Sequence, residues 1–372
     1  MSRLAGIRER IATHWRALGG GDRAVQLMEI CGTHTVAITK GGLRSLLPDG
    51  LRLVSGPGCP VCVTDQAYID QAVHLARQVP GAIVATYGDM VRVPGALGSL
   101  ELARSEGARV EVVYAAHDAV ELARRSAPAE VIFLAVGFET TAPATALAVR
   151  EAREAKLTNF SAFTAHKLVL PAMRALLRTP DVRIDGFLCP GHVSVIIGWR
   201  AYEPVAAEFG RPCVVAGFED EQILAGVEEI LRQLAAGEGC AASVYPAVRP
   251  EGNLTAMGVI EEVFEVADAP WRALGVIPQS GLELSDEYAD LDAARRFDLP
   301  AFEAIEPPGC RCGDVICGRC LPTECGLFAK ACTPRSPVGP CMVSSEGSCA
   351  AYYKYAWRPR ESTRSQAGSP DA

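Results

Sequence analysis

The chain has 372 residues and a formal net charge of −8, with 49% hydrophobic and 22% charged residues. This composition is typical of a folded globular protein with more than one domain, and it excludes a disordered chain or a fibre. Because the chain is acidic, it offers no broad basic face, so neither nucleic acid nor a membrane surface is expected as a partner.

The N-terminal stretch, residues 1–21, places apolar side chains at Leu4, Ile7, Ile11 and Trp15 among charged residues and ends in glycines. This spacing predicts an amphipathic helix and lacks the uninterrupted apolar centre of a signal peptide. The sequence contains no run of about 18 apolar residues, so no transmembrane helix is expected. We therefore expect a cytoplasmic protein.

The next block reads MEICGTHT and carries Cys31, with His34 three residues later. A thiolate between a short apolar run and a helix N-terminus is stabilised by backbone N–H groups, and a nearby imidazolium would add to this effect. Cys31 is therefore a candidate nucleophile or metal ligand. The alternative interpretation is a buried structural cysteine.

The stretch GPGCPVC, residues 56–62, places Cys59 and Cys62 between a predicted strand and a predicted helix. Redox proteins use this arrangement to lower the pKa of one thiol and to form a reversible disulfide. The same spacing also fits half of a metal site that a second cysteine pair completes. Both interpretations remain open from the spacing alone.

Residues 50–240 alternate strand-like and helix-like patterns, which is the rhythm of parallel sheets covered by helices. Strands are predicted at 51–56, 81–88, 109–116, 130–138, 185–191 and 212–218, and helices at 67–78, 118–126, 141–155, 168–178 and 219–237. The order strand, Gly-Phe-Glu, helix occurs twice, at residues 137–139 and 217–219. This repeat suggests two similar α/β halves.

The predicted fold class is α/β, with two similar α/β domains whose parallel sheets are flanked by helices, plus a Cys-rich C-terminal domain. The predicted boundaries give residues 1–130, residues 131–245 and residues 246–372. In the last of these, residues 254–267 are predicted to be helical and to lead into an acidic, irregular connection.

Further polar residues follow predicted strands: Asp89, Arg92, Glu139, Cys189 and His192. In open α/β sheets ligands bind beyond the carboxyl ends of the strands, so these side chains are expected to converge on one crevice. The alternative is that Asp89 and Glu139 cap helices and that His192 bonds to backbone. No Gly-rich nucleotide-phosphate motif occurs at these turns.

The chain contains 14 cysteines, which is unusual because a reducing compartment disfavours structural disulfides. Eight of them fall near the C-terminus: Cys310, Cys312, Cys317, Cys320, Cys325, Cys332, Cys341 and Cys349. A set of thiols without histidine suits zinc or an iron–sulfur cluster. Wide gaps between most of them favour a 4Fe-4S cluster over zinc, and the bound metal is expected to hold this segment folded.

Seven blocks in this order carry a resemblance to a known family: CGTHT, GPGCPVC, GDMVRVPG, GFETTAP, GHVSVIIG, CGLFAKACTP and MVSSEGSCAAYY. With them the chain resembles the HypD family, accessory proteins of nickel-iron hydrogenase maturation. The resemblance implies a scaffold on which an iron carrying two cyanides and one carbon monoxide, Fe(CN)2CO, is assembled. It also implies the small chaperone HypC as a partner, HypE as the cyanide donor, and delivery to the hydrogenase large subunit through the chaperone.

The resemblance also implies roles for individual residues. Cys31 becomes the ligand of the iron, with His34 beside it and a cysteine of the chaperone as a second ligand. Cysteines separated by fourteen, six and sixteen residues hold the 4Fe-4S cluster; these are Cys310, Cys325, Cys332 and Cys349. Cys312 or Cys341 remains an alternative for one of the four.

The family pattern assigns Cys59 and Cys62 to thiol–disulfide redox work that exchanges electrons with the cluster. A low-spin iron with strong-field ligands needs a dry, hydrogen-bonded pocket. The candidate residues around it are Thr33, Thr35, Asp89, Arg92, Glu139 and His192.

Two other functions fit parts of the same pattern. One is an iron–sulfur-dependent thiol–disulfide oxidoreductase that acts on a protein disulfide, which would not need a third reactive thiol at Cys31. The other is a zinc-stabilised structural protein.

Overall fold

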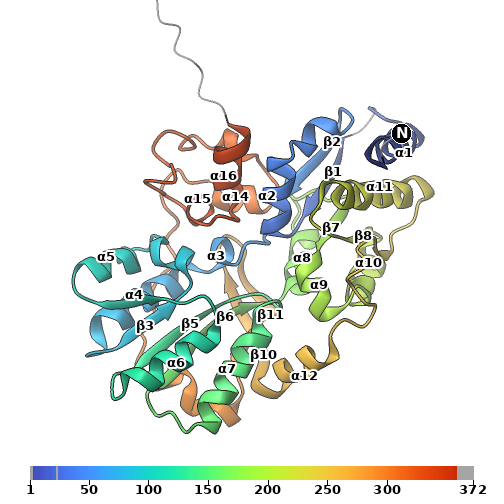
Figure 1. Cartoon of the computed structure of the whole chain (residues 1–372). Coiled ribbons are helices and arrows are strands. Elements are labelled where there is room, and N and C mark those ends of the chain that lie inside the picture. Colours follow the sequence, from blue (N-terminus) through green and yellow to red (C-terminus); the bar gives the residue numbers. More distant parts are fainter. Residues whose placement is uncertain (1–2, 22–23, 358–372) are drawn as a thin grey trace, which may run out of the picture.

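Two β-sheets organise the chain (Figure 1) in the computed structural model, which describes residues 3–21 and 24–357. The first sheet has the strand order β2-β1-β7-β8-β9, and every neighbouring pair is parallel. Its strands are β1 (Val25–Glu29), β2 (Leu51–Ser55), β7 (Gly186–Pro190), β8 (Cys213–Ala216) and β9 (Ala241–Ser243).

The second sheet has the order β10-β11-β6-β5-β3-β4. Its strands are β3 (Ile83–Thr86), β4 (Arg109–Val112), β5 (Val131–Gly137), β6 (Phe160–Lys167), β10 (Phe264–Trp271) and β11 (Gly275–Leu284). Strands β3 to β6 pair in parallel, whereas β10 and β11 form an antiparallel hairpin that joins the edge of β6.

Helices cover both sheets. On the first sheet α1 (Arg3–Ala17) packs along α11 (Asp220–Ala236), where its buried Ile7, Ile11 and Trp15 meet the apolar side chains of the sheet. On the second sheet α6 (Ala116–Ser126), α7 (Ala142–Glu154) and α12 (Leu254–Val263) share one face, and α4 (Gln66–Gln78) and α5 (Leu100–Ser105) lie on the other.

The remaining helices are shorter and lie mostly around the strand ends. They are α2 (Gly32–Lys40), α3 (Pro60–Val63), α8 (Val169–Arg178), α9 (Gly191–Ile197), α10 (Glu203–Phe209), α13 (Ala293–Arg296), α14 (Cys312–Ile316), α15 (Pro340–Val343) and α16 (Ser348–Ala351). Single turns complete the set: η1 (Leu43–Leu46), η2 (Gly88–Arg92), η3 (Arg200–Tyr202), η4 (Asp286–Leu291), η5 (Pro322–Glu324) and η6 (Tyr352–Ala356). Within residues 3–21 and 24–357, no helix has the length and apolar character needed to span a membrane.

The α/β class with mostly parallel sheets is confirmed, and so are the six predicted strands and the helices between them. The prediction for residues 254–267 is wrong beyond Val263, because the chain turns there from α12 into strand β10. The connection expected to be irregular contains the end of β10, strand β11, η4 and α13. Strand β11 pairs with β10, which the sequence analysis also did not predict, and such pairing leaves little pattern in the local sequence.

The two sheets are interleaved along the chain. The first sheet takes β1 and β2 from the N-terminal part and β7 to β9 from residues 186–243, while the second takes the strands between them and the later hairpin. The division expected near residue 130 therefore falls inside the second sheet, between α6 and β5. Local periodicity predicts strands but does not reveal which sheet each one joins.

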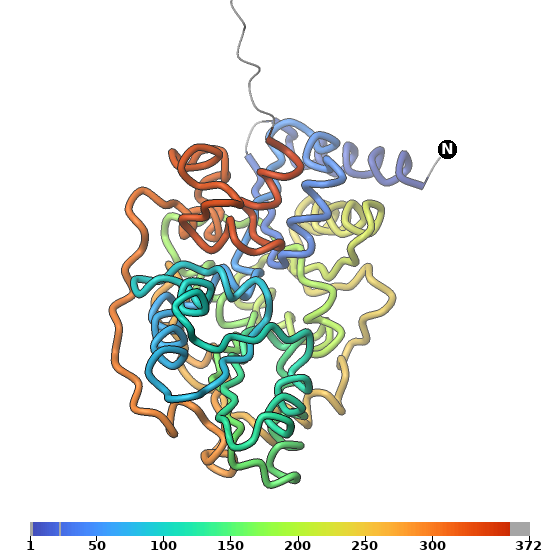
Figure 2. The backbone as a smooth tube through the Cα atoms, turned by 60° about the vertical axis from the view of Figure 1, so that its left-hand side comes forward, coloured from blue at the N-terminus to red at the C-terminus, as the bar shows by residue number. Residues whose placement is uncertain are grey.

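The Cys-rich C-terminal segment lies above the junction of the two sheets. Figure 2 shows the chain after α13 running along the outside of the molecule before it enters this segment at α14. There, α16 packs against α2 and α15 packs against α3 (Figure 1). The segment thus covers two short helices, each of which carries or follows a cysteine singled out by the sequence.

Candidate functional site: a thiol centre where the two sheets meet

Cys31 lies between strand β1 and helix α2, in the N-cap position with an extended backbone (φ −150°, ψ 122°). The backbone N–H groups of Thr33 and His34 stabilise a thiolate at its sulfur. Burial nevertheless raises the pKa of the Cys31 thiol to about 12, and the carboxylates of Glu346 and Glu29 add to the rise. The free thiol is therefore protonated at neutral pH.

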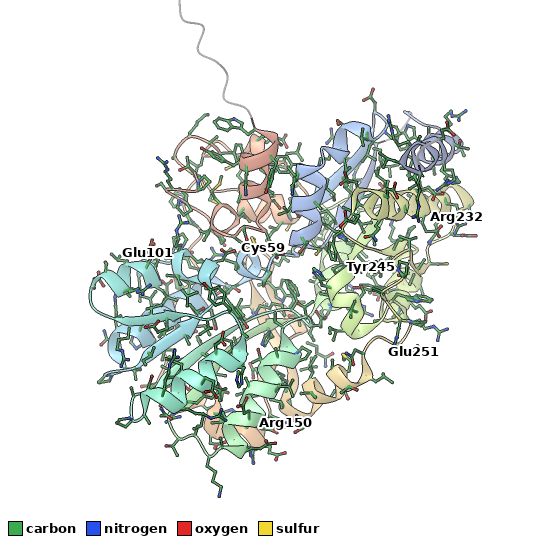
Figure 3. The ribbon with its side chains drawn as sticks, in the orientation of Figure 1. Cys59, Glu101, Arg150, Arg232, Tyr245 and Glu251 are labelled. Carbon is green, nitrogen blue, oxygen red and sulfur yellow. A yellow bond between two sulfur atoms is a disulfide. The ribbon has the colours of Figure 1, made fainter. Side chains whose placement is uncertain are left out.

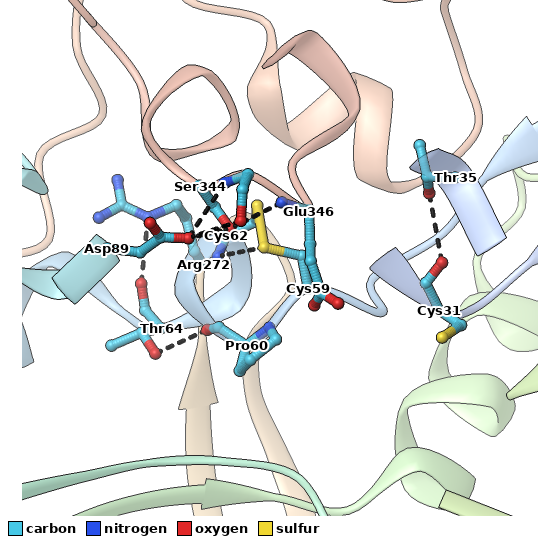
Figure 4. Close-up of a disulfide and its surroundings, with 11 residues drawn as sticks. Cys31, Thr35, Cys59, Pro60, Cys62, Thr64, Asp89, Arg272, Ser344 and Glu346 are labelled. Carbon is cyan, nitrogen blue, oxygen red and sulfur yellow. Dashed lines mark hydrogen bonds between the residues drawn. A yellow bond between two sulfur atoms is a disulfide. The ribbon is translucent and has the colours of Figure 1, made fainter. Parts of the chain in front are cut away.

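Cys59 and Cys62 form a disulfide (Figure 4), with Cα atoms 5.2 Å apart. Cys59 occupies the N-cap position of α3, and its sulfur accepts a hydrogen bond from the Cys62 N–H at 3.2 Å. Figure 3 shows Cys59 at the junction of the C-terminal segment and the two sheets, and Glu101 at the periphery of the molecule. The pair is thus a dithiol in its oxidised form at the centre of the molecule.

The Cys31 loop and the disulfide loop are in direct contact. The Gly32 N–H donates to the Gly58 carbonyl at 3.2 Å. A Cβ atom at position 58 would collide with the backbone of Ile30 and Cys31, so only glycine lets the two loops approach this closely. The structure therefore brings together the loops of two separate motifs, one with Cys31 and the other with Cys59 and Cys62.

His34 does not supply a positive charge to this site. Its Nε2 lies 2.9 Å from the Gly217 carbonyl, which fixes it as the protonated ring nitrogen. Burial lowers the pKa of the imidazole to about 4, so the expected imidazolium beside Cys31 is wrong at neutral pH. The centroid of the Phe218 ring lies 4.9 Å from that of the His34 ring and 4.1 Å from that of the His192 ring, so Phe218 packs against both imidazoles.

A buried carboxyl that the motif analysis missed lies beside Cys31. Glu29, the last residue of β1, is fully buried, and its Oε1 accepts from the Thr35 hydroxyl at 2.6 Å. Its Oε2 lies 3.5 Å from the Cys31 N–H. Burial raises the pKa of Glu29 to about 7. Its signal in the sequence is an acid at the end of a mostly apolar stretch, two residues before Cys31.

Three consecutive residues of the C-terminal segment bridge the two sheets (Figure 4). The Asp89 carboxylate accepts from the Ser344 hydroxyl at 3.1 Å and from the Ser345 N–H at 3.0 Å. The next residue, Glu346, accepts from the Thr33 hydroxyl at 2.7 Å. Asp89 therefore anchors the segment to the second sheet, and Thr33 anchors it to the first.

The remaining predicted pocket residues take other roles and do not share one crevice. Arg92 donates to the Pro334 carbonyl at 2.5 Å, a further anchor of the C-terminal segment. Glu139 accepts from the Val169 N–H at 2.9 Å, and burial raises its pKa to about 7. The Glu139 carboxylate thus binds the N–H of the first residue of α8, a helix distant in the sequence, whereas the Asp89 carboxylate binds the C-terminal segment.

The β10–β11 hairpin, which was not predicted from the sequence, supports α3, the helix at the disulfide. At its tip, the Arg272 N–H donates to the Val63 carbonyl at 2.9 Å, and Arg272 Nε donates to the Thr64 carbonyl at 3.1 Å. The Arg272 side chain is only 1% exposed and pairs with Glu306 at 3.4 Å. These bonds satisfy the C-terminal carbonyls of α3 and hold the dithiol in place.

The C-terminal thiols form a compact group. The Cys312 sulfur accepts hydrogen bonds from the thiols of Cys310, Cys341 and Cys349, which lowers the pKa of Cys312 and raises the pKa of the other three. A Cβ atom at Gly339 would lie 2.6 Å from Cys312 Sγ and 2.7 Å from Cys310 Sγ. The glycine leaves room for the sulfurs, and their convergence is the donor set of a thiophilic metal centre.

Two of the four cysteines of the family spacing, Cys310 and Cys349, belong to this group, and Cys325 and Cys332 lie near it. Cys332 Sγ accepts from the Val338 N–H at 3.3 Å, and Cys325 Sγ lies 3.9 Å from the Gly309 carbonyl. In the part of the chain that the structure describes, no three cysteine sulfurs all lie within 4.8 Å of one another.

Comparison with known proteins identifies the family. The fold and the site define an α/β protein with a thiol centre at a sheet junction and a Cys-rich segment docked over it. The family described as "HypD: Hydrogenase formation hypA family" matches residues 5–356. The chain belongs to the HypD family of hydrogenase maturation factors.

Curated relatives agree along nearly the whole chain. The hydrogenase maturation factor HypD of Cupriavidus necator is 44% identical over 356 residues, covering 93% of this chain and 94% of the relative. That of Escherichia coli strain K12 is 44% identical over 336 residues, covering 90% of both. A putative hydrogenase expression/formation protein of Methanocaldococcus jannaschii is 42% identical over 332 residues, covering 89% and 92%.

Proposed function

We propose that this maturation factor is a scaffold on which the Fe(CN)2CO unit of nickel-iron hydrogenase is assembled, with Cys31 as an iron ligand. The observation that carries the proposal is the contact between the Cys31 loop and the disulfide loop, joined through Gly32 and Gly58. A protonated, nearly buried thiol with two backbone N–H groups directed at it suits a soft metal cargo that displaces the proton.

The neighbouring dithiol supplies redox chemistry to this site. Reduction of the Cys59–Cys62 disulfide takes two electrons and two protons and gives two thiols. The Cys59 sulfur, which accepts the Cys62 N–H, is the one whose anionic form the helix stabilises. Thr33 and Thr35 hold the surrounding loop through Glu346 and Glu29, while His34 contributes a neutral, anchored ring.

The Cys-rich segment fits a 4Fe-4S cluster. Its donors are thiols with no histidine among them, and Gly339 leaves space beside the sulfurs. Cys310, Cys325, Cys332 and Cys349 would hold the cluster, with Cys312 or Cys341 as the alternative for one position. A bound cluster supplies electrons one at a time.

The partners follow from this role. We propose that the small chaperone HypC contributes a further thiol to the iron, that HypE donates the cyanide groups, and that the hydrogenase large subunit receives the iron through the chaperone.

Infrared spectroscopy of the anaerobically co-purified complex with HypC tests the scaffold. We expect bands in the cyanide and carbon monoxide region that disappear in Cys31→Ala and persist in Cys240→Ala, where an exposed cysteine is removed. An intact complex without such bands contradicts the scaffold and favours a thiol–disulfide oxidoreductase that uses the Cys59–Cys62 disulfide alone.

Metal analysis tests the C-terminal centre separately. Anaerobically prepared protein is expected to contain about four irons and four acid-labile sulfides in the cluster. Both should fall sharply in Cys349→Ala and stay unchanged in Cys240→Ala. One zinc per chain without sulfide would overturn the cluster assignment.

A further inference from the structure

Glu29 occupies a position where an apolar side chain would be expected. It ends β1, an inner strand of the first sheet, where it faces Ser55 of β2 and Leu188 of β7 in the ladder. Its side chain is 0% exposed. A buried carboxyl lowers the stability of a fold unless its partners compensate, and an apolar residue of similar size is often neutral or stabilising there.

The hydrogen bonds of the Glu29 carboxyl and carbonyl reach the two loops that carry Cys31 and the disulfide. One carboxyl oxygen accepts the Thr35 hydroxyl at 2.6 Å, and the other lies 3.5 Å from the Cys31 N–H. The Glu29 backbone carbonyl accepts the Gly56 N–H at 2.7 Å, where the disulfide loop begins. A single residue therefore contacts the chain on both sides of the Cys31 sulfur and at the start of the neighbouring motif.

Further polar side chains extend from Glu29 and Thr35 toward the C-terminal segment. The Thr39 hydroxyl donates to the Thr35 carbonyl at 2.6 Å, and Arg44 donates to the Thr39 hydroxyl at 2.9 Å. The Arg44 guanidinium lies 4.9 Å from the centre of the Tyr352 ring. Arg44 is also the positive charge that acts on Glu29. Thr35, which binds the carboxyl, is thus linked through Thr39 to Arg44, and its own N–H also donates to the Cys31 carbonyl at 3.0 Å.

We infer that Glu29 is a positioning residue of the Cys31 site, whose carboxyl holds the Cys31 amide and the Thr35 hydroxyl and so fixes the loop that presents the Cys31 sulfur. The inference rests on the proposed role of Cys31 as an iron ligand. A carboxyl kept only for the fold would instead make the whole sheet less stable when it is replaced.

Two substitutions in the full chain separate these roles. Glu29→Met keeps the volume and removes both acceptors, whereas Glu29→Gln keeps one acceptor for Thr35. Glu130→Gln is the matched control, since Glu130 is a partly buried carboxyl that binds Ser161 and Arg296 in the second sheet. Hydrogen exchange read by mass spectrometry reports on residues 30–36, and thermal unfolding reports on the fold.

We expect exchange at residues 30–36 to be at least tenfold faster in Glu29→Met, intermediate in Glu29→Gln and unchanged in Glu130→Gln, with no loss of thermal stability in Glu29→Met. In the complex with HypC, the infrared bands should shift or weaken in the same order. Unchanged exchange in both Glu29 variants overturns the inference, as does faster exchange across the whole first sheet with a lowered Tm. If the wild-type complex shows no bands, the proposed function fails, while the exchange comparison still decides the role of Glu29.

Discussion

Buried ionisable side chains near the strand ends link the stability of this fold to pH. Glu139 has a pKa raised from 4.5 to about 7 by burial, so the folded state binds its proton more tightly than the unfolded state does. This contribution to stability is fully present below pH 4.5 and is lost as the pH rises through 7. His34, whose pKa falls to about 4, acts in the opposite direction, and its contribution is lost as the pH falls from 6.5 to 4.

Replacing Glu139 isolates the contribution of its carboxyl to the pH dependence of stability. We expect Glu139→Gln to lose less stability than the wild type between pH 5 and pH 8, with a difference on the order of 3 kcal/mol at most, because the amide does not ionise. Denaturant unfolding at the two pH values measures it, and the other titrating groups cancel in the comparison. Parallel pH profiles of the two proteins would contradict the assigned pKa.

The site residues differ in how far the sequence could reveal them. Cys31, Cys59 and Cys62 stand in short motifs whose chemistry can be predicted from residue type and spacing. Glu29 and Glu346 could not be assigned, because their importance depends on burial and on which distant hydroxyl each one accepts. The neutral state of His34 likewise follows from burial, which the sequence around it does not show.

At the scale of elements, helix α3 determines which thiol of the dithiol reacts first. Cys59 is 5% exposed and its sulfur accepts a backbone N–H, whereas Cys62 is 1% exposed. In reduced protein we expect Cys59 to be alkylated about tenfold faster than Cys62, since a backbone N–H bond favours the thiolate. Limited iodoacetamide treatment followed by peptide mass spectrometry measures both rates, with exposed Cys240 as the internal reference. Faster modification of Cys62 would reverse the assignment.

The contact between the two loops depends on a residue without a side chain. Gly58→Ala places a methyl group against the backbone of Cys31, so we expect a loss of about 1–3 kcal/mol of stability and loss of the infrared bands of the iron. Gly258→Ala is the control, because this glycine lies in α12 with no atom near the added Cβ. There we expect a gain of up to about 1 kcal/mol. Equal effects of the two changes would show that the close contact is unimportant.

Elements with strong local periodicity were predictable, and those defined by distant pairing were not. The strands β3 and β5 have mostly apolar runs of strand length with a glycine at or shortly after their ends, at Gly88 and Gly137. The hairpin β10–β11 instead alternates buried and exposed residues irregularly, with a register shift between Ala267 and Ala269. Its position under α3 depends on contacts of Arg272 that no local pattern contains.

At the scale of the whole molecule, the C-terminal segment fastens the two sheets together over the site. Asp89→Ala removes the acceptor of Ser344 and Ser345, and we expect faster hydrogen exchange at residues 340–350 and faster loss of iron to a chelator, with little change in the exchange of either sheet. Glu101→Gln, an exposed acid in the same part of the chain, is the control. Unaltered exchange at residues 340–350 would show that the Asp89 contacts do not fasten the segment.

The interleaved strand order has a consequence for the order in which the site is made during synthesis. Strands β1 and β2 leave the ribosome first but cannot complete their sheet until β7 and β8 follow, more than one hundred residues later. The thiols of Cys31, Cys59 and Cys62 therefore spend most of translation without their final neighbours. Ser344 and Glu346, which close the site, are made among the last residues of the chain. A nascent protein thus keeps these three sulfurs without the contacts of Ser344 and Glu346 until those residues have been made.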